Sequence, residues 1–332
     1  MHVAILSTGG TIASAKDPST GLQVPGSLTG EMLLSASGLD MSVLKYTVSI
    51  HSVFQIPSNH MTFNHADQLI KRMETMLLNG QADAFVITHG TDTMDEIAFY
   101  LDLHWNHLAP VVITGAQVTP NESNTDSFYN LQAALSVAAC GESRGRGVQL
   151  VFNGRIFNAR YVNKWHTSNI DGFGSIQTGP EGAVDLNEVF YYHKPANRIV
   201  FPPISTETDS NVRVEIVTSY VDADPSIINH WVQAAVSALV IAGVGRGQTS
   251  VPLSREIKRA VQGGMPIVIT SSTGSGFVAP VYGYEGSLND LLDAGAIAGF
   301  DYTAKKARVL LYSIIASGMR DKNEIASKFH CM

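Results

Sequence analysis

The 332-residue sequence predicts an α/β fold of two α/β domains with mainly parallel sheets, a larger N-terminal domain and a smaller C-terminal one. Short runs rich in valine and isoleucine recur without polar alternation, which is typical of strands buried on both faces of a parallel sheet. Amphipathic helical periods lie between these runs. This strand–helix–strand order favours a doubly wound α/β layer.

The elements follow in a regular order. In the first half we expect strands over 2–6, 84–88, 111–114 and 148–152 and helices over 65–78, 94–105 and 125–140. Prolines and polar residues then gather over 180–212, which indicates a domain boundary. The pattern resumes with strands over 212–217, 238–242 and 266–270, helices over 253–261 and 288–294, and a final helix over 304–316. We therefore expect domains over 1–190 and 212–332, joined by a linker over 191–211.

Composition excludes several classes of protein. Hydrophobic residues make up 45% of the chain and charged ones 15%, which excludes general disorder. The net charge is −7 without a lysine or arginine run, so we expect no nucleic-acid partner. No apolar stretch is long enough to span a bilayer, and no signal peptide is visible, so we expect no membrane association and a cytoplasmic location, or a periplasmic one for a processed form. The two cysteines, Cys140 and Cys331, do not indicate a disulfide scaffold.

The turn after the first strand is a candidate ligand loop. Ligands of open parallel sheets bind beyond the carboxyl ends of the strands. Here the sequence continues Ser7-Thr8-Gly9-Gly10-Thr11, and paired glycines let a backbone approach a ligand closely. A plain structural turn or a phosphate loop is the alternative, although neither common phosphate-binding pattern is present.

The turn after the strand over 84–88 is chemically denser. It carries His89, Gly90, Thr91, Asp92 and Thr93 before a predicted helix. Helix capping by Thr91 or Asp92 would explain one of these residues but not the cluster. We therefore predict a functional site here.

A threonine hydroxyl needs a base to act as a nucleophile. Asp92 is adjacent to Thr91 in sequence, but its reach is not assured. The lysines of the first domain that could serve are Lys16, Lys45, Lys71 and Lys164. Lys164 follows the strand over 148–152 and so belongs to the same rim of the sheet. For each lysine, a solvated surface position is the alternative.

Metal and serine chemistry receive little support. His104 and His107 are three apart, and His60 and His65 are five apart. No acidic or cysteine partner completes a zinc spacing, so we expect no metal or other cofactor. No GxSxG elbow is present, which argues against an α/β-hydrolase serine.

Two segments, ILSTGGTIA and VITHGTDTM, about 80 residues apart, resemble the two signatures of the bacterial-type L-asparaginase family, which includes glutaminase-asparaginases. The resemblance continues through PVVITGA, YVNKWHTS, AGVGRGQ and KKARVLL, and so covers nearly the whole chain. It implies a catalytic first domain, a second domain that contributes to the neighbouring subunit's site, and a homotetramer built as a dimer of dimers. It also implies hydrolysis of asparagine to aspartate and ammonia.

The resemblance assigns roles to individual residues. Thr11 is implied as the nucleophile that forms an acyl-enzyme, and Thr91, Asp92 and Lys164 as the second catalytic group. Ser58 and Asp92 would hold the α-carboxylate and α-amino groups of the substrate. The further implied substrate contacts are Gly10, Gln23, Asn59, Gly90, Thr91, Ala116, Gln248 and Glu285.

Some positions depart from the family pattern. Residues 14–44 contain no tyrosine where the family has a catalytic one, and Gln23 lies near its place. Asn59 replaces a glutamine, and Gln248 an asparagine, with Arg246 two residues earlier. Glu285 is the nearest candidate for an acidic residue of the neighbouring subunit. Two alternatives therefore stay open: an amidohydrolase that acts mainly on glutamine or a larger amide, and a non-catalytic amino-acid sensor.

Overall fold

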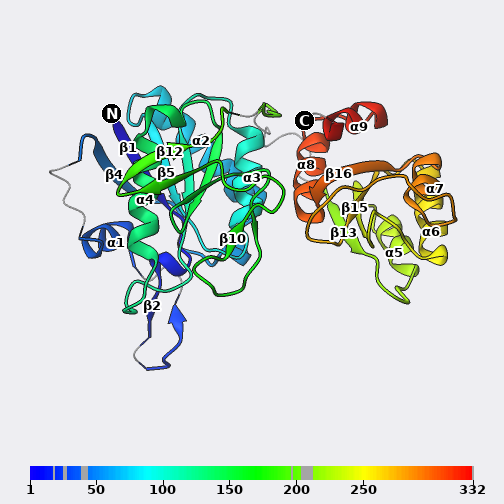
Figure 1. Cartoon of the computed structure of the whole chain (residues 1–332), viewed down its shortest axis with the longest axis horizontal. Coiled ribbons are helices and arrows are strands. Elements are labelled where there is room, and N and C mark those ends of the chain that lie inside the picture. Colours follow the sequence, from blue (N-terminus) through cyan, green and yellow to red (C-terminus); the bar gives the residue numbers. More distant parts are fainter. Residues whose placement is uncertain (18, 25–27, 39–43, 196, 203–211, 331–332) are drawn as a thin grey trace. The chain divides into compact units, whose positions relative to one another are not determined.

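The computed structural model describes residues 1–17, 19–24, 28–38, 44–195, 197–202 and 212–330, apart from the side chains of Lys16 and Gln23. The chain divides into two compact units, Met1–Val200 and Phe201–Met332, which we call unit 1 and unit 2 (Figure 1). Each unit has its own sheet and its own helices. The boundaries expected at residues 190 and 212 stay predictions.

Unit 1 is built on one eight-stranded sheet. In spatial order its strands are β12 (Glu188–Tyr191), β11 (Gly182–Asp185), β8 (Arg155–Asn158), β7 (Val148–Phe152), β6 (Val111–Thr114), β5 (Ala84–Thr88), β1 (His2–Ser7) and β4 (Thr47–Ser52). The strands from β7 to β4 run parallel, whereas β8, β11 and β12 pair antiparallel. The predicted α/β class with a mainly parallel sheet is confirmed.

The central strands of unit 1 end level with one another. All residues of β5, β6 and β7 are buried, as the unbroken apolar runs predict. In the register, Ser7 of β1 lies beside Thr88 of β5, and Thr88 lies beside Thr114 of β6. The loops after these three strands therefore start from one edge of the sheet, which we call the carboxyl edge.

Helices cover both faces of this sheet. They are α1 (Gly30–Ala36), α2 (Phe63–Leu78), α3 (Met94–His104) and α4 (Ser127–Ala139). Residues of α4 share a buried cluster with Val86 and Val112. Phe85 lies on the opposite face because strand side chains alternate, and its ring contacts Trp105 at the end of α3, with the ring centroids 5.8 Å apart. This is a doubly wound arrangement.

Small elements complete unit 1. Two short hairpins are formed by β2 (Ala15–Lys16) with β3 (Gln23–Val24), and by β9 (Asn163–Lys164) with β10 (Phe173–Gly174). Among the described residues, single turns of 3₁₀ helix are η1 (Thr11–Ala13), η3 (Ser58–His60) and η4 (Gly141–Ser143).

Unit 2 repeats the parallel pattern on a smaller scale. Its four strands, all parallel, lie in the order β13 (Val214–Thr218), β14 (Ala238–Gly243), β15 (Ile267–Ser271) and β16 (Ile297–Thr303). Its helices are α5 (Ser226–Gln233), α6 (Val251–Gln262), α7 (Leu288–Asp293), α8 (Ala304–Ala316) and α9 (Lys322–His330). Leu253 and Ile257 of α6 pack with Ile241 and Ile269 in a separate core.

The expectation that the helix over 304–316 is the last helix of the chain is wrong. The helix over 304–316 forms as α8, but it is not the last helix, because α9 follows it. The sequence of α9 is mostly polar, and its buried residues are Ile325 and Phe329, a single helical turn apart. A single pair of apolar residues one turn apart is too short a pattern to indicate a helix.

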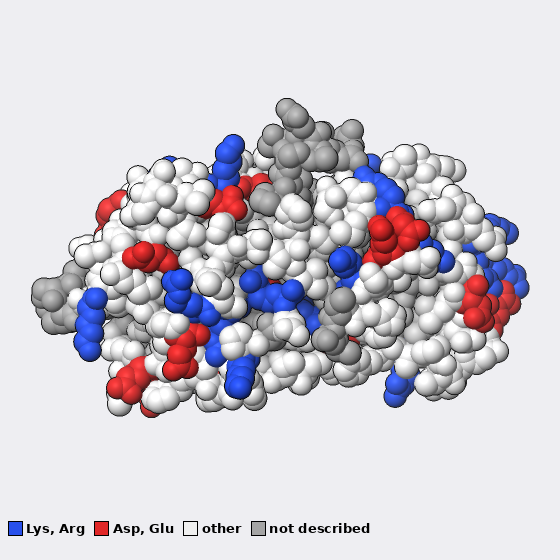
Figure 2. All heavy atoms as spheres, turned by 90° about the horizontal axis from the view of Figure 1, so that it is seen from above, with Lys and Arg blue, Asp and Glu red and all other residues white. Residues whose placement is uncertain are grey.

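The described surface mixes charges of both signs. On the face shown in Figure 2, acidic and basic side chains are interspersed among neutral ones. Across the described ranges, no helix combines the length and the apolarity needed to cross a membrane.

Candidate active site

The loop after β1 is shaped by two glycines. Gly9 and Gly10 both have positive φ, at 106° and 82°. Behind them Thr11 begins η1, and the amide of Ala13 and the hydroxyl of Ser14 both donate to the carbonyl of Gly10, at 3.0 and 2.7 Å. These bonds fix the turn that presents the half-buried Thr11 at the carboxyl edge.

Three loops converge at this edge, which we call the site loops: residues 8–11, 57–59 and 89–93. A Cβ on Gly10 would lie 2.3 Å from both the Cα and the N of Gly90, so the two backbones touch where only glycines fit. A Cβ on Gly90 would in turn lie 2.8 Å from the Oγ of Ser58. Thr93 donates its hydroxyl to the carbonyl of Ser58 at 2.7 Å. The structure thus brings Gly10, Gly90 and Ser58 together.

Lys164 reaches the site loops from the β9–β10 hairpin. Its Nζ donates to Thr91 Oγ1 at 2.8 Å and to Asp92 Oδ1 at 2.7 Å. The Lys164 side chain is 12% exposed and that of Asp92 70%, so the ion pair has a sheltered cation and a solvated anion. The backbone N of Lys164 also donates to Asp95 in the first turn of α3, at 3.3 Å. The carboxyl edge therefore holds the Thr91 hydroxyl, the Asp92 carboxylate and the Lys164 amine in contact.

His89 supports the loop in its neutral form. Burial lowers the pKa of His89 to about 4, although a bond with the Gly90 carbonyl and the nearby Asp95 carboxylate favour the charged ring. Nδ1 lies 2.7 Å from the Gly90 oxygen, so the neutral ring donates there, and Nε2 has no hydrogen-bond partner among the described residues. This histidine stiffens the backbone beneath Thr91 without adding charge.

The loop after β6 supplies a residue that sequence reasoning missed. Ala116 is completely buried, and the next side chain, Gln117, accepts a hydrogen bond from Thr91 Oγ1 at 3.2 Å. Gln117 directly follows the TGA motif at a strand end, which is the only signal in the sequence that could have found it. Asp126 anchors this loop by accepting from the backbone amides of Gln117 and Val118, at 3.1 and 2.9 Å.

Predicted substrate contacts in unit 1 differ in how far their side chains are buried. Ser58 is 5% exposed, whereas Asn59 beside it is exposed. Gln23 lies in β3 opposite Lys16, and its side chain is outside the described part of the structure. The role of Gln23 in place of the missing tyrosine therefore stays a prediction.

Predicted substrate contacts in unit 2 are held by their own unit. Gln248 is 8% exposed, and its Oε1 accepts from the amide of Leu288 at the start of α7, at 2.9 Å. Glu285 accepts two bonds from Arg255, at 2.9 and 3.3 Å, and these hydrogen bonds lower the pKa of the Glu285 carboxyl. Arg246 is exposed. The roles of Gln248 and Glu285 at a neighbouring site stay predictions.

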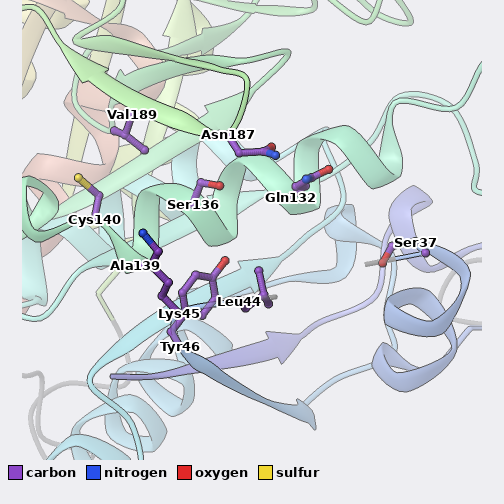
Figure 3. Close-up of a pocket in the computed structure, with 11 residues that line it drawn as sticks. Ser37, Leu44, Lys45, Tyr46, Gln132, Ser136, Ala139, Cys140, Asn187 and Val189 are labelled. Carbon is purple, nitrogen blue, oxygen red and sulfur yellow. The ribbon is translucent and has the colours of Figure 1, made fainter. Parts of the chain in front are cut away.

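A separate hollow lies in unit 1. It measures about 620 Å³, and Figure 3 shows Gln132, Ser136 and Cys140, from α4 and its C-terminal end, lining it together with Lys45 and Tyr46. None of the residues predicted for catalysis lines this hollow. Within the described ranges, no three histidine, cysteine, aspartate or glutamate residues are grouped so that they could hold a metal ion.

Comparison with known proteins identifies relatives along the whole chain. The model of the asparaginase N-terminal domain matches residues 2–197, and that of the glutaminase/asparaginase C-terminal domain matches residues 213–329. An L-asparaginase of Bacillus licheniformis is 39% identical over 326 residues, which cover 96% of this chain and 98% of that protein. A probable L-asparaginase of Deinococcus radiodurans is 38% identical over 324 residues, covering 96% and 94% of the two chains. The solved structure of a probable cytoplasmic L-asparaginase from Campylobacter jejuni matches with a TM-score of 0.87 at 29% identity, covering 100% of this chain and 99% of that one.

Proposed function

Because this chain belongs to the asparaginase family, we propose that it is an amidohydrolase that converts L-asparagine to L-aspartate and ammonia. The observation that carries the proposal is the 2.8 Å contact between Lys164 Nζ and Thr91 Oγ1, at the edge from which the Thr11 loop also starts. Hydrolysis of an amide needs a nucleophile, a base and a proton donor within reach of one another. These side chains supply all three.

In the proposed reaction, Thr11 attacks the side-chain amide. Its oxygen bonds to the amide carbon, and its proton passes through Thr91 to the neutral amine of Lys164. The carbon–nitrogen bond then breaks, and ammonia leaves with a proton returned by that group. Water next cleaves the acyl-enzyme ester, which releases aspartate and restores Thr11. Two moderate barriers replace one high barrier.

The site loops also supply the recognition that the reaction needs. A zwitterionic amino acid requires an acceptor for its ammonium and donors for its carboxylate. The exposed carboxylate of Asp92 suits the ammonium, and the buried hydroxyl of Ser58 suits the carboxylate. Backbone amides at Gly10, Gly90 and Ala116 would face the oxyanion that forms on the amide carbon.

Ammonia release from asparagine across pH 6–9 tests the proposal. Thr11→Val and Thr91→Val each replace a hydroxyl by a methyl group of similar volume. We expect each to lower kcat at least about 10²-fold, because the nucleophile or its activating hydroxyl is lost. Thr91→Val also removes the hydrogen bonds to Lys164 and Gln117, so we expect it to lower the free energy of unfolding by about 1 kcal/mol, too little to unfold the protein. The matched control is Thr75→Val, because Thr75 lies exposed on α2 and bonds only its own helix.

Two results would overturn this function. One is a wild-type protein that releases no ammonia from asparagine or glutamine. The other is a wild-type rate in either the Thr11 or the Thr91 variant. Calorimetry that records tight asparagine binding without heat of hydrolysis would favour the sensor instead.

A broader amide specificity is the second candidate. Asn59 is one methylene shorter than the glutamine of the family and lies exposed beside Ser58, which leaves more room at the α-amino end of the substrate. The ratio of kcat/KM for asparagine to that for glutamine distinguishes the two.

The assembly and location belong to the proposal as well. We place the chain in a homotetramer, a dimer of dimers, in which Gln248 and Glu285 serve a neighbouring site. A cytoplasmic location is supported by the name of the Campylobacter relative.

A further inference from the structure

The Thr91 hydroxyl has two partners of different chemistry. Lys164 Nζ lies 2.8 Å from Thr91 Oγ1, and Gln117 Oε1 lies 3.2 Å from it. A lysine ammonium can only donate hydrogen bonds. When Lys164 is charged, the hydroxyl oxygen therefore accepts from Lys164, and its own proton points to Gln117.

Gln117 is held firmly in this position. Its backbone amide donates to both carboxylate oxygens of Asp126, each at 3.1 Å. Asn130 in turn donates to Asp126 and to the carbonyl of Gly115, at 3.0 Å each. The loop that carries Gln117 is thus bound to the start of α4, so the amide group can turn but the residue cannot withdraw.

The other half of the Gln117 amide is unused. Its Nε2 is buried and has no hydrogen-bond partner among the described residues. It faces Gly172, where an added Cβ would lie only 2.4 Å from Nε2. The carbonyl of Gly172 accepts from the amide of Trp165, next to Lys164. A buried donor left unpaired costs free energy, so this one calls for an explanation.

The proposed proton transfer from Thr11 through Thr91 to Lys164 requires the hydrogen bond between Thr91 and Lys164 to reverse its direction. When neutral Lys164 takes a proton from Thr91, that proton must point to Nζ, away from Gln117. The Oε1 of Gln117 would then face the lone pairs of Thr91 Oγ1, acceptor against acceptor. A half-turn of the amide places Nε2–H there instead, which donates to the oxygen as negative charge develops on it.

Building on the function proposed above, we infer that Gln117 is a positioning residue whose amide turns with the protonation state of Lys164. With Lys164 charged, Oε1 accepts the Thr91 proton, and with Lys164 neutral, Nε2 donates to Thr91 Oγ1. A glutamine amide carries an acceptor and a donor on one planar group, so a half-turn exchanges the two.

Two substitutions of similar length separate the two halves of this cycle. Gln117→Glu keeps an acceptor and adds negative charge, which favours the charged amine. We expect the rising limb of the kcat–pH profile for asparagine to move up by about one pH unit. Gln117→Met removes both the acceptor that serves the charged amine and the donor that serves the neutral one, so we expect the limb to move much less than in Gln117→Glu. In Gln117→Met the maximal kcat falls about tenfold, because the developing charge on Thr91 loses a donor, while KM changes less than about twofold.

A limb that moves up in Gln117→Glu, together with a lower maximal kcat at nearly unchanged KM in Gln117→Met, distinguishes positioning from a structural role, which would lower both activities without moving the limb. Gln132→Met, on α4 beside the hollow of Figure 3, is the control and should leave the profile in place. A limb that stays in place in Gln117→Glu, or a wild-type maximal kcat in Gln117→Met, would overturn the inference while wild-type ammonia release keeps the proposed function. If Gln117→Glu does not fold by circular dichroism, the fall of maximal kcat at nearly unchanged KM in Gln117→Met decides alone.

Discussion

The two units of this protein are built on the same principle but treat the carboxyl ends of their strands differently. In unit 1, the loops there expose chemistry, with Thr91 and Asp92 in contact with Lys164. In unit 2, the corresponding loop after β14 turns its Gln248 side chain inward, where it pairs with the amide of Leu288. The first edge holds a contact network that the proposed function uses, and the side chain at the second edge bonds within its own unit.

The difference comes from the strands that follow the parallel core. In unit 1 the chain turns back after β7 into antiparallel β8, and the β9–β10 hairpin then brings Lys164 to the carboxyl edge. In the described part of unit 2, all four strands are parallel and no such return occurs. The parallel strands bring hydroxyls and glycines to one edge, whereas the amine of Lys164 comes from a segment that follows a reversal of chain direction.

The largest effect is expected when a side-chain atom is added at the carboxyl edge of unit 1. Gly10→Ala adds a Cβ 2.3 Å from the backbone of Gly90 at a φ of 82°. We expect the free energy of unfolding to fall by about 4 kcal/mol, because a backbone clash and an unfavourable conformation add together. Urea titration measures this loss, and ammonia release should disappear with it.

The matched substitution in unit 2 is Gly283→Ala. A Cβ there meets nothing within 4 Å, so we expect stability within about 0.5 kcal/mol of the wild type. If the two substitutions cost the same, the backbone contact between Gly10 and Gly90 would not be the cause of the loss.

Acid should affect unit 1 more than unit 2. Burial lowers the pKa of His89 to about 4 from its ordinary 6.5. Its contribution to stability is therefore complete above pH 6.5 and is lost as the pH falls from 6.5 towards 4, by about 3 kcal/mol. Unit 2 contains His230 and His330, which are both exposed. Hydrogen exchange between pH 7 and 4 should show protection falling first in unit 1.

Two variants sharpen this expectation. His89→Gln should flatten the pH dependence of the unfolding free energy in that window, whereas His60→Gln, at an exposed position, should preserve it. Equal losses of protection in both units would contradict the assignment to His89.

The smallest effect is expected at Gln248. Gln248→Ala leaves the amide of Leu288 without its partner, so we expect unit 2 to lose about 1 kcal/mol. Gln233→Ala, at the exposed end of α5, is the control and should have almost no effect. Melting curves measure both. A fall in kcat/KM well beyond the loss of folded protein would add a role at a neighbouring site to the structural one.

Much of the parallel framework could be predicted from sequence, because buried parallel strands leave unbroken apolar runs such as 84–88 and 148–152. Lys164 was expected at the same edge because it follows the strand over 148–152, but antiparallel β8 lies in between, and Lys164 reaches Thr91 from the β9–β10 hairpin instead. The antiparallel strands β8, β11 and β12 escaped prediction. They are four residues each and lie among turns, where neither length nor period distinguishes them.

Gln117 and Asp126 were missed for a different reason. Each acts through a contact between segments that pattern analysis treats separately: Gln117 with Thr91, and Asp126 with the amides nine and eight residues before it. A polar side chain next to a strand end indicates only that a contact is available there. Which partner it finds depends on the register of the sheet and on where α4 begins.

The short hairpin that carries Lys164 leads us to expect a limit on the temperature at which the proposed activity persists. Its ladder holds only two residue pairs, Phe173 with Lys164 and Gly174 with Asn163. We expect so short a ladder to open in local fluctuations that leave the eight-stranded sheet intact. On warming, the amine would then leave Thr91 before the core melts, and with Lys164 in its proposed role activity would be lost before unfolding. Stiffening these four residues would extend the active range without altering the core.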